Sequence, residues 1–463
     1  RLAEWSEALA RHWGNTGNAG RAAYYTAMAA EKNRKIYALE TAHRLFGQAA
    51  GLIDANPGCA DEHFWAGMIL NWGELINMLG DYKGVCELLE PCLARFEALG
   101  DKRQLSIFLS WLGLAYAVRG QGARAKPLLD RAMALAQEIE DDECYMQAGI
   151  GLGWLYSYWM PYSEHTDALI KQYAEQALET GRKIKDNVKV QHAYTLLGIH
   201  HIQRSRFSDA RRYSMELYDH GRMYQDDRSL ALAHWMLGFC DIYEDRYEEA
   251  LRHCEQSLEL NRNELNLDGL CALAGKGGAL ALTGSVQEGL VLMATAKHEM
   301  LAKEFIMPLS GVEIPLGAIM VLAGQMKKGI RHIEHFMEHW AAMGNSAQPV
   351  WGHLFLSEIF LQLALGKEKP PFKIILKNIG FILLNAPTAR RKARYHLEEV
   401  VKKSRQYNMP GFLAKALYGL GILEQTRKNY PKSRSYLEEG LKIASESGLL
   451  IAGRIRLTLD SIL

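Results

Sequence analysis

Apolar side chains recur along most of this chain at steps of three and four residues, the period of one face of an α-helix. Around position 113 one such stripe is made by Trp111, Leu112, Leu114, Ala115 and Tyr116. A second stripe follows at Ala125, Leu128, Leu129, Ala132 and Leu135. Between the two, Gly120 can adopt the left-handed backbone conformation that ends a helix. This pattern predicts a hairpin of two helices.

The same hairpin pattern returns about every forty residues. It is marked by glycines separated by 40, 40, 45, 40, 39 and 40 positions, namely Gly73, Gly113, Gly153, Gly198, Gly238, Gly277 and Gly317. Seven residues further along, the turn positions hold Gly80, Gly120, Gly284 and Gly324, with Ser205 and Asp245 at the equivalent points. Small residues such as Gly113 and Ala125 let the two helices of a hairpin approach closely. A repeat of this length predicts hairpins stacked into a solenoid.

We therefore expect an all-α fold: a right-handed superhelical solenoid of hairpins that occupies residues 1–463 as one array. Its expected parts are N-terminal hairpins over 1–58, regular repeats over 59–345, an irregular hairpin region over 346–410, and a C-terminal repeat and cap over 411–463. The glycine rhythm is lost in the third part, where Pro370-Pro371 should break a helix. A longer, aromatic turn is expected around Trp159-Met160-Pro161-Tyr162.

The order of residues within each hairpin carries a resemblance. Leu197-Gly198 is followed by Phe207 after a turn and then by Ala210, and the same series recurs at Leu237-Gly238 and Tyr247. These residues resemble the tetratricopeptide repeat, over about 60–345 and again over about 410–450. The usual repeat has about 34 residues. The longer period here implies that each helix is about one turn longer.

Composition narrows the classes of function. Hydrophobic residues make up 48% of the chain, which is enough for a continuous core. The net charge is +1, whereas nucleic-acid binding normally needs a basic excess, so we expect no nucleic-acid partner. The seven cysteines form no CxxC pair, as is typical of reduced thiols, and we expect a cytoplasmic location. The apolar run over 372–384 contains lysines and is too short to span a bilayer, so no membrane partner is expected.

Candidate chemistry is sparse. Gly275-Lys276-Gly277 lacks the glycine and hydroxyl positions of a phosphate-binding loop. His332, His335 and His339 share one helix face, but three consecutive turns of a straight helix rarely converge on one zinc ion. The basic cluster Arg390-Arg391-Lys392 is interpreted as a solvated helix face, with an acidic partner as the alternative. We assign no catalytic residue, no metal ligand and no cofactor, and do not expect this segment to be an enzyme.

The inner surface of the solenoid is the predicted binding site. In a superhelix of hairpins the first helices line the concave groove, which we expect to take a protein or peptide partner or a small effector. The side chains expected to point into it are Trp154, Tyr158, His192, Thr195, Ile199, Trp235 and Phe239. The alternative is that these rings pack between adjacent hairpins as ordinary core. Homo-oligomers are also compatible with the sequence.

Both ends of the chain carry a second resemblance. The N-terminal segments are Leu9-Ala10-Arg11-His12-Trp13, Gly17-Asn18, Ala23-Tyr24-Tyr25 and Ala38-Leu39-Glu40. The C-terminal segments are Ala364-Leu365-Gly366, Ile374-Ile375-Leu376-Lys377-Asn378 and Ala386-Pro387. Together they resemble the region that follows the ATPase module in bacterial proteins that join a class III adenylate/guanylate cyclase, a STAND-type ATPase and a helical-repeat tail.

That resemblance implies a regulatory, effector-sensing tail whose catalytic modules lie upstream. Neither the cyclase metal aspartates nor the ATPase phosphate loop has a counterpart in this sequence. Two other hypotheses stay open: the inducer-binding repeat domain of a STAND-family transcription activator, and a free-standing adaptor. A DNA-binding module downstream in the parent would favour the first of these, whereas a cyclase domain upstream would favour the regulatory tail.

Overall fold

The computed structural model describes residues 4–36, 38–262, 266–366 and 378–462, and this part of the chain contains helices and turns and no strand. The all-α prediction is confirmed. The chain divides into two compact units, Arg1–Leu155 and Tyr156–Leu463. The expectation of one continuous array over all 463 residues stays a prediction.

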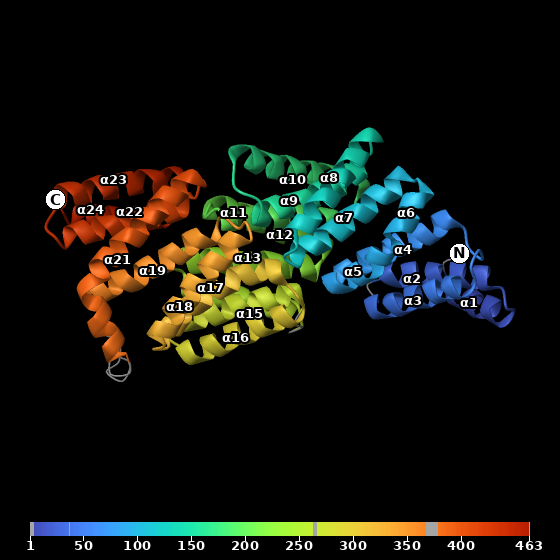
Figure 1. Cartoon of the computed structure of the whole chain (residues 1–463), viewed down its shortest axis with the longest axis horizontal. Coiled ribbons are helices and arrows are strands. Elements are labelled where there is room, and N and C mark those ends of the chain that lie inside the picture. The colour runs from blue at the N-terminus through green and yellow to red at the C-terminus, as the bar shows by residue number, and fades with distance from the viewer. Residues whose placement is uncertain (1–3, 37, 263–265, 367–377, 463) are drawn as a thin grey trace. The chain divides into compact units, whose positions relative to one another are not determined.

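The first unit consists of helices joined by short turns, and its short segments fall within residues 82–99 (Figure 1). Its helices are α1 (Ser6–Asn15), α2 (Ala19–Lys35), α3 (Leu39–Ala55), α4 (Glu62–Met78), α5 (Tyr82–Leu89), the 3-10 turn η1 (Glu90–Cys92), α6 (Leu93–Leu99), α7 (Lys102–Val118) and α8 (Gly122–Glu138). The next helix, α9 (Asp142–Trp159), crosses the boundary between the units.

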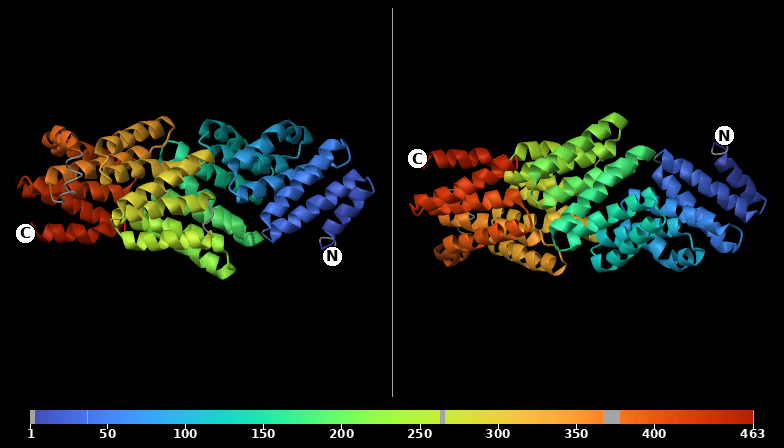
Figure 2. Two further views of the ribbon diagram at one scale, coloured as in Figure 1. Left: turned by 90° about the horizontal axis from the view of Figure 1, so that it is seen from below. Right: turned by 90° about the horizontal axis from the view of Figure 1, so that it is seen from above.

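The second unit holds the remaining hairpins, coloured from green to red in Figures 1 and 2. Its first helices are α10 (Glu164–Ile184), α11 (Asn187–Gln203), α12 (Phe207–Tyr224), α13 (Asp227–Tyr243), α14 (Tyr247–Leu260), α15 (Leu267–Leu282) and α16 (Val286–Ala302). The others are α17 (Ile306–Leu322), α18 (Met326–Ala342), α19 (Gln348–Leu365), α21 (Ile379–Gln406), α22 (Pro410–Gln425), α23 (Tyr430–Glu446) and α24 (Ile451–Asp460).

The close approach of paired helices, expected from the small residues, is confirmed. A Cβ atom added to Gly113 would lie 2.6 Å from the Cγ atom of Leu129 on the partner helix. At Gly277 it would lie 2.8 Å from the carbonyl oxygen of Gly289, which is backbone and cannot move aside easily. Methyl groups at these points would separate the helices and leave cavities around them.

The first helices of successive hairpins form one layer. In the second unit α11, α13, α15, α17 and α19 each contact the next member of this series, in addition to the hairpin partner. Helix α11 is buried at all but a few of its positions, and α13 and α15 at most of theirs. Their partners α12, α14, α16 and α18 bury only one stripe each.

Acidic or amide side chains fix where the first helices begin. At the N-termini of α4, α7, α11, α13 and α15 a side-chain oxygen accepts a backbone N–H, whereas α17 has no such cap. The capping residues are Asp61, Asp101, Asp186, Asp226 and Asn266. Asp141 likewise accepts the N–H of Cys144. Such caps satisfy donors that a helix leaves unpaired at its first turn. The caps recur with the same period as the glycines.

The irregular region contains a long helical hairpin. Helices α19 and α21 pack against each other, and α21 extends over 28 residues. Pro387 lies inside α21. The expected helix break at Pro370-Pro371, and the quoted segment from Ile374 to Lys377, fall outside the described residues.

Candidate functional site

Six of the seven predicted groove residues belong to the second unit, and Trp154 belongs to the first. Four of the six, Tyr158, Thr195, Ile199 and Trp235, are buried. His192 and Phe239 are half-buried, as is Trp154. The six come from the end of α9 and from α11 and α13.

Two of these rings form a close pair. Trp235 and Phe239 meet edge to face, with ring centroids 5.6 Å apart. Phe239 also lies against α15, because a Cβ atom on Gly275 would come within 3.2 Å of its ring. The indole Nε1 of Trp235 is buried and has no hydrogen-bond partner among the described residues. The same is true of Nε2 of Gln191, on the neighbouring helix α11.

A polar network is buried where α9, α10 and α11 meet. His200 lies with Nε2 2.8 Å from Oδ1 of Asp167, and its Nδ1 is 3.3 Å from Oγ of Ser157. Arg206 donates to both carboxylate oxygens of Asp167 at 3.1 Å. Burial alone would raise the pKa of Asp167, but the hydrogen bond from His200 and the charge of Arg206 hold it well below its usual range.

This network resembles a nucleophile–base–acid series in its connections only. Burial lowers the pKa of His200 to about 4, so the ring is neutral near pH 7. The Ser157 hydroxyl belongs to a side chain that is 4% exposed, and a substrate cannot reach it. The network therefore fixes the packing of α10 on α11 and does not act as a nucleophile.

The second unit is also joined across a long stretch of sequence. At the turn between α11 and α12, Ser205 accepts the N–H of Gly411 on its carbonyl oxygen at 3.1 Å. Its hydroxyl oxygen accepts the N–H of Phe412 at 3.2 Å. Helix α22 thus begins against the tip of a hairpin that lies much earlier in the chain. Ser205 and Phe412 are 207 residues apart in the sequence.

The next hairpin tip makes a charged contact with the same helices. Asp245, between α13 and α14, lies 3.2 Å from Nζ of Lys415 on α22 and 2.9 Å from a guanidinium nitrogen of Arg454 on α24. Burial would raise the pKa of Asp245, but these two cations outweigh it and lower the pKa. We call the contacts of Ser205 and Asp245 with α22 and α24 the seam.

Ser205 and Asp245 occupy the turn positions that are glycine in other repeats. Both have a left-handed backbone, with φ of 50° and 63°, which is unfavourable for a side chain. At the equivalent positions Gly80 and Gly120 have φ of 74° and 76° at no such cost. In these two repeats the turn residue that replaces glycine holds the C-terminal helices.

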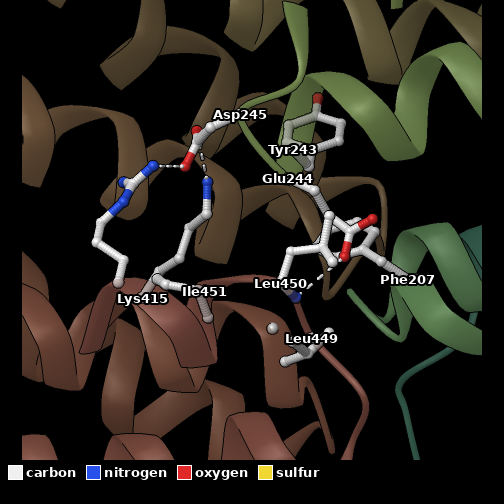
Figure 3. Close-up of a pocket in the computed structure, with 10 residues that line it drawn as sticks. Phe207, Tyr243, Glu244, Asp245, Lys415, Leu449, Leu450 and Ile451 are labelled. Carbon is white, nitrogen blue, oxygen red and sulfur yellow. Dashed lines mark hydrogen bonds and ion pairs between the residues drawn. The ribbon is translucent and has the colours of Figure 1, made fainter. Parts of the chain in front are cut away.

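A pocket of about 50 Å³ lies in the seam (Figure 3). Its walls carry both signs of charge and apolar side chains, contributed by Phe207, Tyr243, Glu244, Asp245, Gly411, Lys415, Leu449, Leu450, Ile451 and Arg454. The space is enough for a few water molecules or one small polar group.

Four aromatic rings also belong to the seam, and two of them, Phe207 and Tyr243, line the pocket. Phe207 stacks on Tyr243 at 5.7 Å, and Tyr243 meets Trp351 edge to face at 4.6 Å. Phe412 contacts both Phe207 and Trp351, at 6.1 Å and 5.3 Å. All four rings are buried. The sequence analysis placed Phe207 in the repeat pattern but did not connect it with Phe412, since no periodicity links them.

The other side chains considered as candidate metal, phosphate or acidic-partner sites have hydrogen-bond or ion-pair partners in the structure. Nε2 of His332 lies 2.9 Å from the carbonyl oxygen of Glu313, and burial lowers the pKa of His332 to about 4. Within the described ranges, no group of three metal-ligating side chains is found. Lys276 pairs with Glu255 at 3.0 Å. In the basic cluster Lys392 donates to Asn385 at 2.7 Å.

The described helices include none that is long and apolar enough to cross a membrane. The architecture defines the class: the chain is a helical-repeat protein with a tetratricopeptide-like fold. No protein-family model matches it, and no curated protein sequence matches it either.

Several solved structures match this chain at low sequence identity and low TM-score. A Rap protein complexed with Competence and Sporulation Factor has a TM-score of 0.45 at 15% identity, over 81% of this chain and 100% of that one. The apo form of the quorum sensor NprR from B. thuringiensis has a TM-score of 0.41 at 12% identity, over 90% of this chain and 97% of that one. The APC/C hetero-tetramer Cut9-Hcn1 has a TM-score of 0.38 at 11% identity, over 99% of this chain and 90% of that one. At these values the similarity concerns the fold alone.

Proposed function

We propose that this chain is a non-catalytic, effector-sensing interaction domain whose inner helices bind an extended peptide segment of a partner. The observation that carries the proposal is the pair of buried, unpartnered donors on α11 and α13: the amide of Gln191 and the indole N–H of Trp235. An unpaired buried donor costs about 1–3 kcal/mol, which a ligand carbonyl group would recover.

The neighbouring side chains suit such a ligand. His192 and Phe239 are half-buried, so part of each ring remains available for contact. Thr195, Ile199 and Tyr158 complete the proposed contact surface within the second unit. Aromatic rings give large contact area at little cost in side-chain entropy, which is why they anchor many interfaces.

The competing assignment is that these rings are core. Trp235 and Tyr158 are 7% and 6% exposed, and truncating either to alanine would lower stability as well as any binding. Trp235→Ala is therefore a poor test. Trp235→Phe removes the N–H donor and keeps most of the buried area.

We further propose that the domain is the regulatory tail of a nucleotide cyclase with a STAND-type ATPase. The support is the resemblance of the two end segments, described above. A partner that binds one state of the second unit more tightly than another would shift the equilibrium of the attached modules by its differential affinity. The coding sequence upstream tests this part directly, and an upstream region without a cyclase domain would contradict it.

The binding proposal is tested with random short peptides displayed on phage and selected on the wild-type chain. Peptides that bind should bind at least tenfold more weakly to Trp235→Phe, with helical content unchanged by circular dichroism. Trp351→Phe is the matched control, because it also removes a buried, unpartnered indole N–H but lies in the seam. Equal binding by all three proteins would contradict the proposal, as would hydrolysis or cyclisation of a nucleotide by the chain alone.

A further inference from the structure

Arg204 is a fully buried cation that forms no ion pair within the described part of the chain. It is 1% exposed at the C-terminal end of α11. Its guanidinium lies 4.6 Å from the ring centroid of Tyr162, and one of its terminal nitrogens donates to Oγ of Ser346 at 3.4 Å. Among the described residues no carboxylate pairs with it, and its Nε has no hydrogen-bond partner. Arginine is almost never fully buried unless it is paired.

Further unpartnered donors surround the same junction between α11 and the start of α19. Asn345, 2% exposed, uses Oδ1 to accept the N–H groups of Ala347 and Gln348 at 3.0 and 3.1 Å. This fixes its Nδ2 as a donor, and that donor is buried without a partner. Both amide atoms of Gln348 are also unpartnered, on a side chain that is 0% exposed.

The charges in this region do not balance. Arg206 is paired with Asp167, but its second terminal nitrogen is buried and unpartnered. Burial lowers the pKa of His200 to about 4 and that of His201 to about 2, so both rings are neutral near pH 7. Two buried arginines thus share one buried carboxylate. Burial also lowers the pKa of Arg204 to about 10, as expected for a cation without sufficient compensation.

The first backbone N–H groups of helix α19 are not available to bind an anion. Asn345 accepts the N–H groups of Ala347 and Gln348, and position 349 is a proline, which has none. An anion that compensates Arg204 would therefore be bound by side chains and not by the first backbone N–H groups of α19. The side chains with unpartnered atoms there are cationic or neutral: the guanidinium of Arg204, the second terminal nitrogen of Arg206, and the amides of Asn345 and Gln348.

We propose that this junction binds a small monovalent anion, such as chloride, between the guanidinium of Arg204 and the amide of Asn345. The anion supplies the negative charge that this part of the fold lacks and accepts hydrogen bonds from the unpartnered donors. Because burying a charge without compensation is unfavourable, anion binding stabilises the contact of α11 with the connection between α18 and α19. The site is distinct from the proposed peptide-binding surface around Trp235.

Chloride is the probe for the test. The melting temperature of the full chain is measured in sodium chloride and in sodium gluconate at equal ionic strength, and chloride-35 NMR line widths report binding directly. The wild type should melt several degrees higher in chloride and should broaden the chloride line. Arg204→Met should lose both effects and melt at or above the wild-type temperature in gluconate, since an apolar residue removes the uncompensated charge.

A second variant keeps the proposal testable if Arg204→Met does not fold. Ser346→Asp places a carboxylate beside the guanidinium, so it should raise the melting temperature in gluconate and abolish the chloride response. Arg212→Met, which removes an exposed arginine paired with Asp209 and Glu216, is the control and should keep the response. A wild type that does not respond, or a response that persists in Arg204→Met or Ser346→Asp, would overturn the proposal.

Discussion

The carboxylate of Asp245 accepts a hydrogen bond of 3.2 Å from Nζ of Lys415, which lies 170 residues further along the chain. Both side chains are largely shielded, at 22% and 15% exposure. Together with the bonds to Ser205, this contact fastens the C-terminal helices to two hairpin tips. In a solenoid whose repeats touch only their neighbours such contacts are not expected. They make the seam the natural place for a test of cooperativity in the second unit.

Asp245→Asn should loosen α22 and α24. Asparagine keeps the shape and tolerates the left-handed backbone at φ of 63°, so the change isolates the charge. Lys415 is left without its counter-ion, and we expect a loss of about 1–3 kcal/mol. Hydrogen exchange should show faster exchange in Pro410–Gln425 and Ile451–Asp460. Asp209→Asn, in an exposed ion pair with Arg212, should leave exchange there unchanged. Equal protection in both variants would contradict the role of Asp245.

Glycine at the Ser205 turn should not stabilise the chain, although the backbone there is left-handed. The relief of strain is about 1 kcal/mol, but the buried N–H of Phe412 loses its acceptor at a cost of about 1–3 kcal/mol. Gln225→Gly is the matched variant: the residue has φ of 53°, is exposed, and ends α12. It should stabilise by about 0.5–1 kcal/mol in urea unfolding. A similar gain from Ser205→Gly would show that the bond to Phe412 contributes nothing.

Two adjacent glycines of α15 should respond in opposite directions to alanine. At Gly277 the added methyl group would meet the Gly289 carbonyl oxygen and the Met293 backbone nitrogen at 2.8 and 3.0 Å. We expect a loss of about 1–3 kcal/mol or more from overpacking. At Gly278 the nearest atom is Cδ1 of Ile242 at 3.7 Å, so Gly278→Ala should gain up to about 1 kcal/mol of helix propensity. Thermal unfolding of the two variants checks this, and equal effects would contradict the close-approach argument.

The contribution of His200 to stability should fall as the pH falls from 7 to 5. The pKa of His200 is lowered to about 4 in the folded state, whereas the unfolded chain has its ordinary value near 6.5. At His200 the unfolded state therefore binds more protons than the folded state in this window, and the contribution of this residue to stability rises with pH. His200 alone should contribute a difference of about 2 kcal/mol between pH 7 and pH 5. Burial raises the pKa of Glu313 to about 7, which acts in the opposite direction, because stability from its protonated form is lost as the pH rises.

The measurement is urea unfolding at the two pH values. His200→Gln keeps an N–H donor for Asp167 and removes the titrating ring, so its pH dependence should be weaker than that of the wild type by about the 2 kcal/mol assigned to His200. His165→Gln is the control, because His165 is exposed. An unchanged pH dependence in His200→Gln would show that His200 is not the group responsible.

The repeat itself could be predicted because it depends on local rules. The period of the apolar stripes sets each helix, glycine sets the turn, and the absence of bulk at Gly113 and Gly277 sets the distance between paired helices. The caps at Asp186 and Asp226 follow the same period and could have been found from the sequence as well. A residue in these roles acts on neighbours within one hairpin, so its type and spacing are enough.

The burial of the predicted groove residues could not be derived from the sequence, for a related reason. Helical spacing places Thr195, Ile199 and Trp235 on the inner helices, but it cannot say how much of each side chain the next helix covers. The burial of these side chains depends on α15 and α17, where Gly275 and Gly311 leave room for the ring of Phe239. Their binding role stays a prediction.

What the sequence by itself determined is the class of this protein: helices, hairpins, their period and their close pairing. Only the tertiary structure decided that Ser205 and Asp245, exceptions within the repeat, meet α22 and α24, and that Arg204 is buried at the start of α19. The physical reason is the accumulation of small rotations from one hairpin to the next. These rotations bring distant turns together, and no local pattern in the chain encodes their sum.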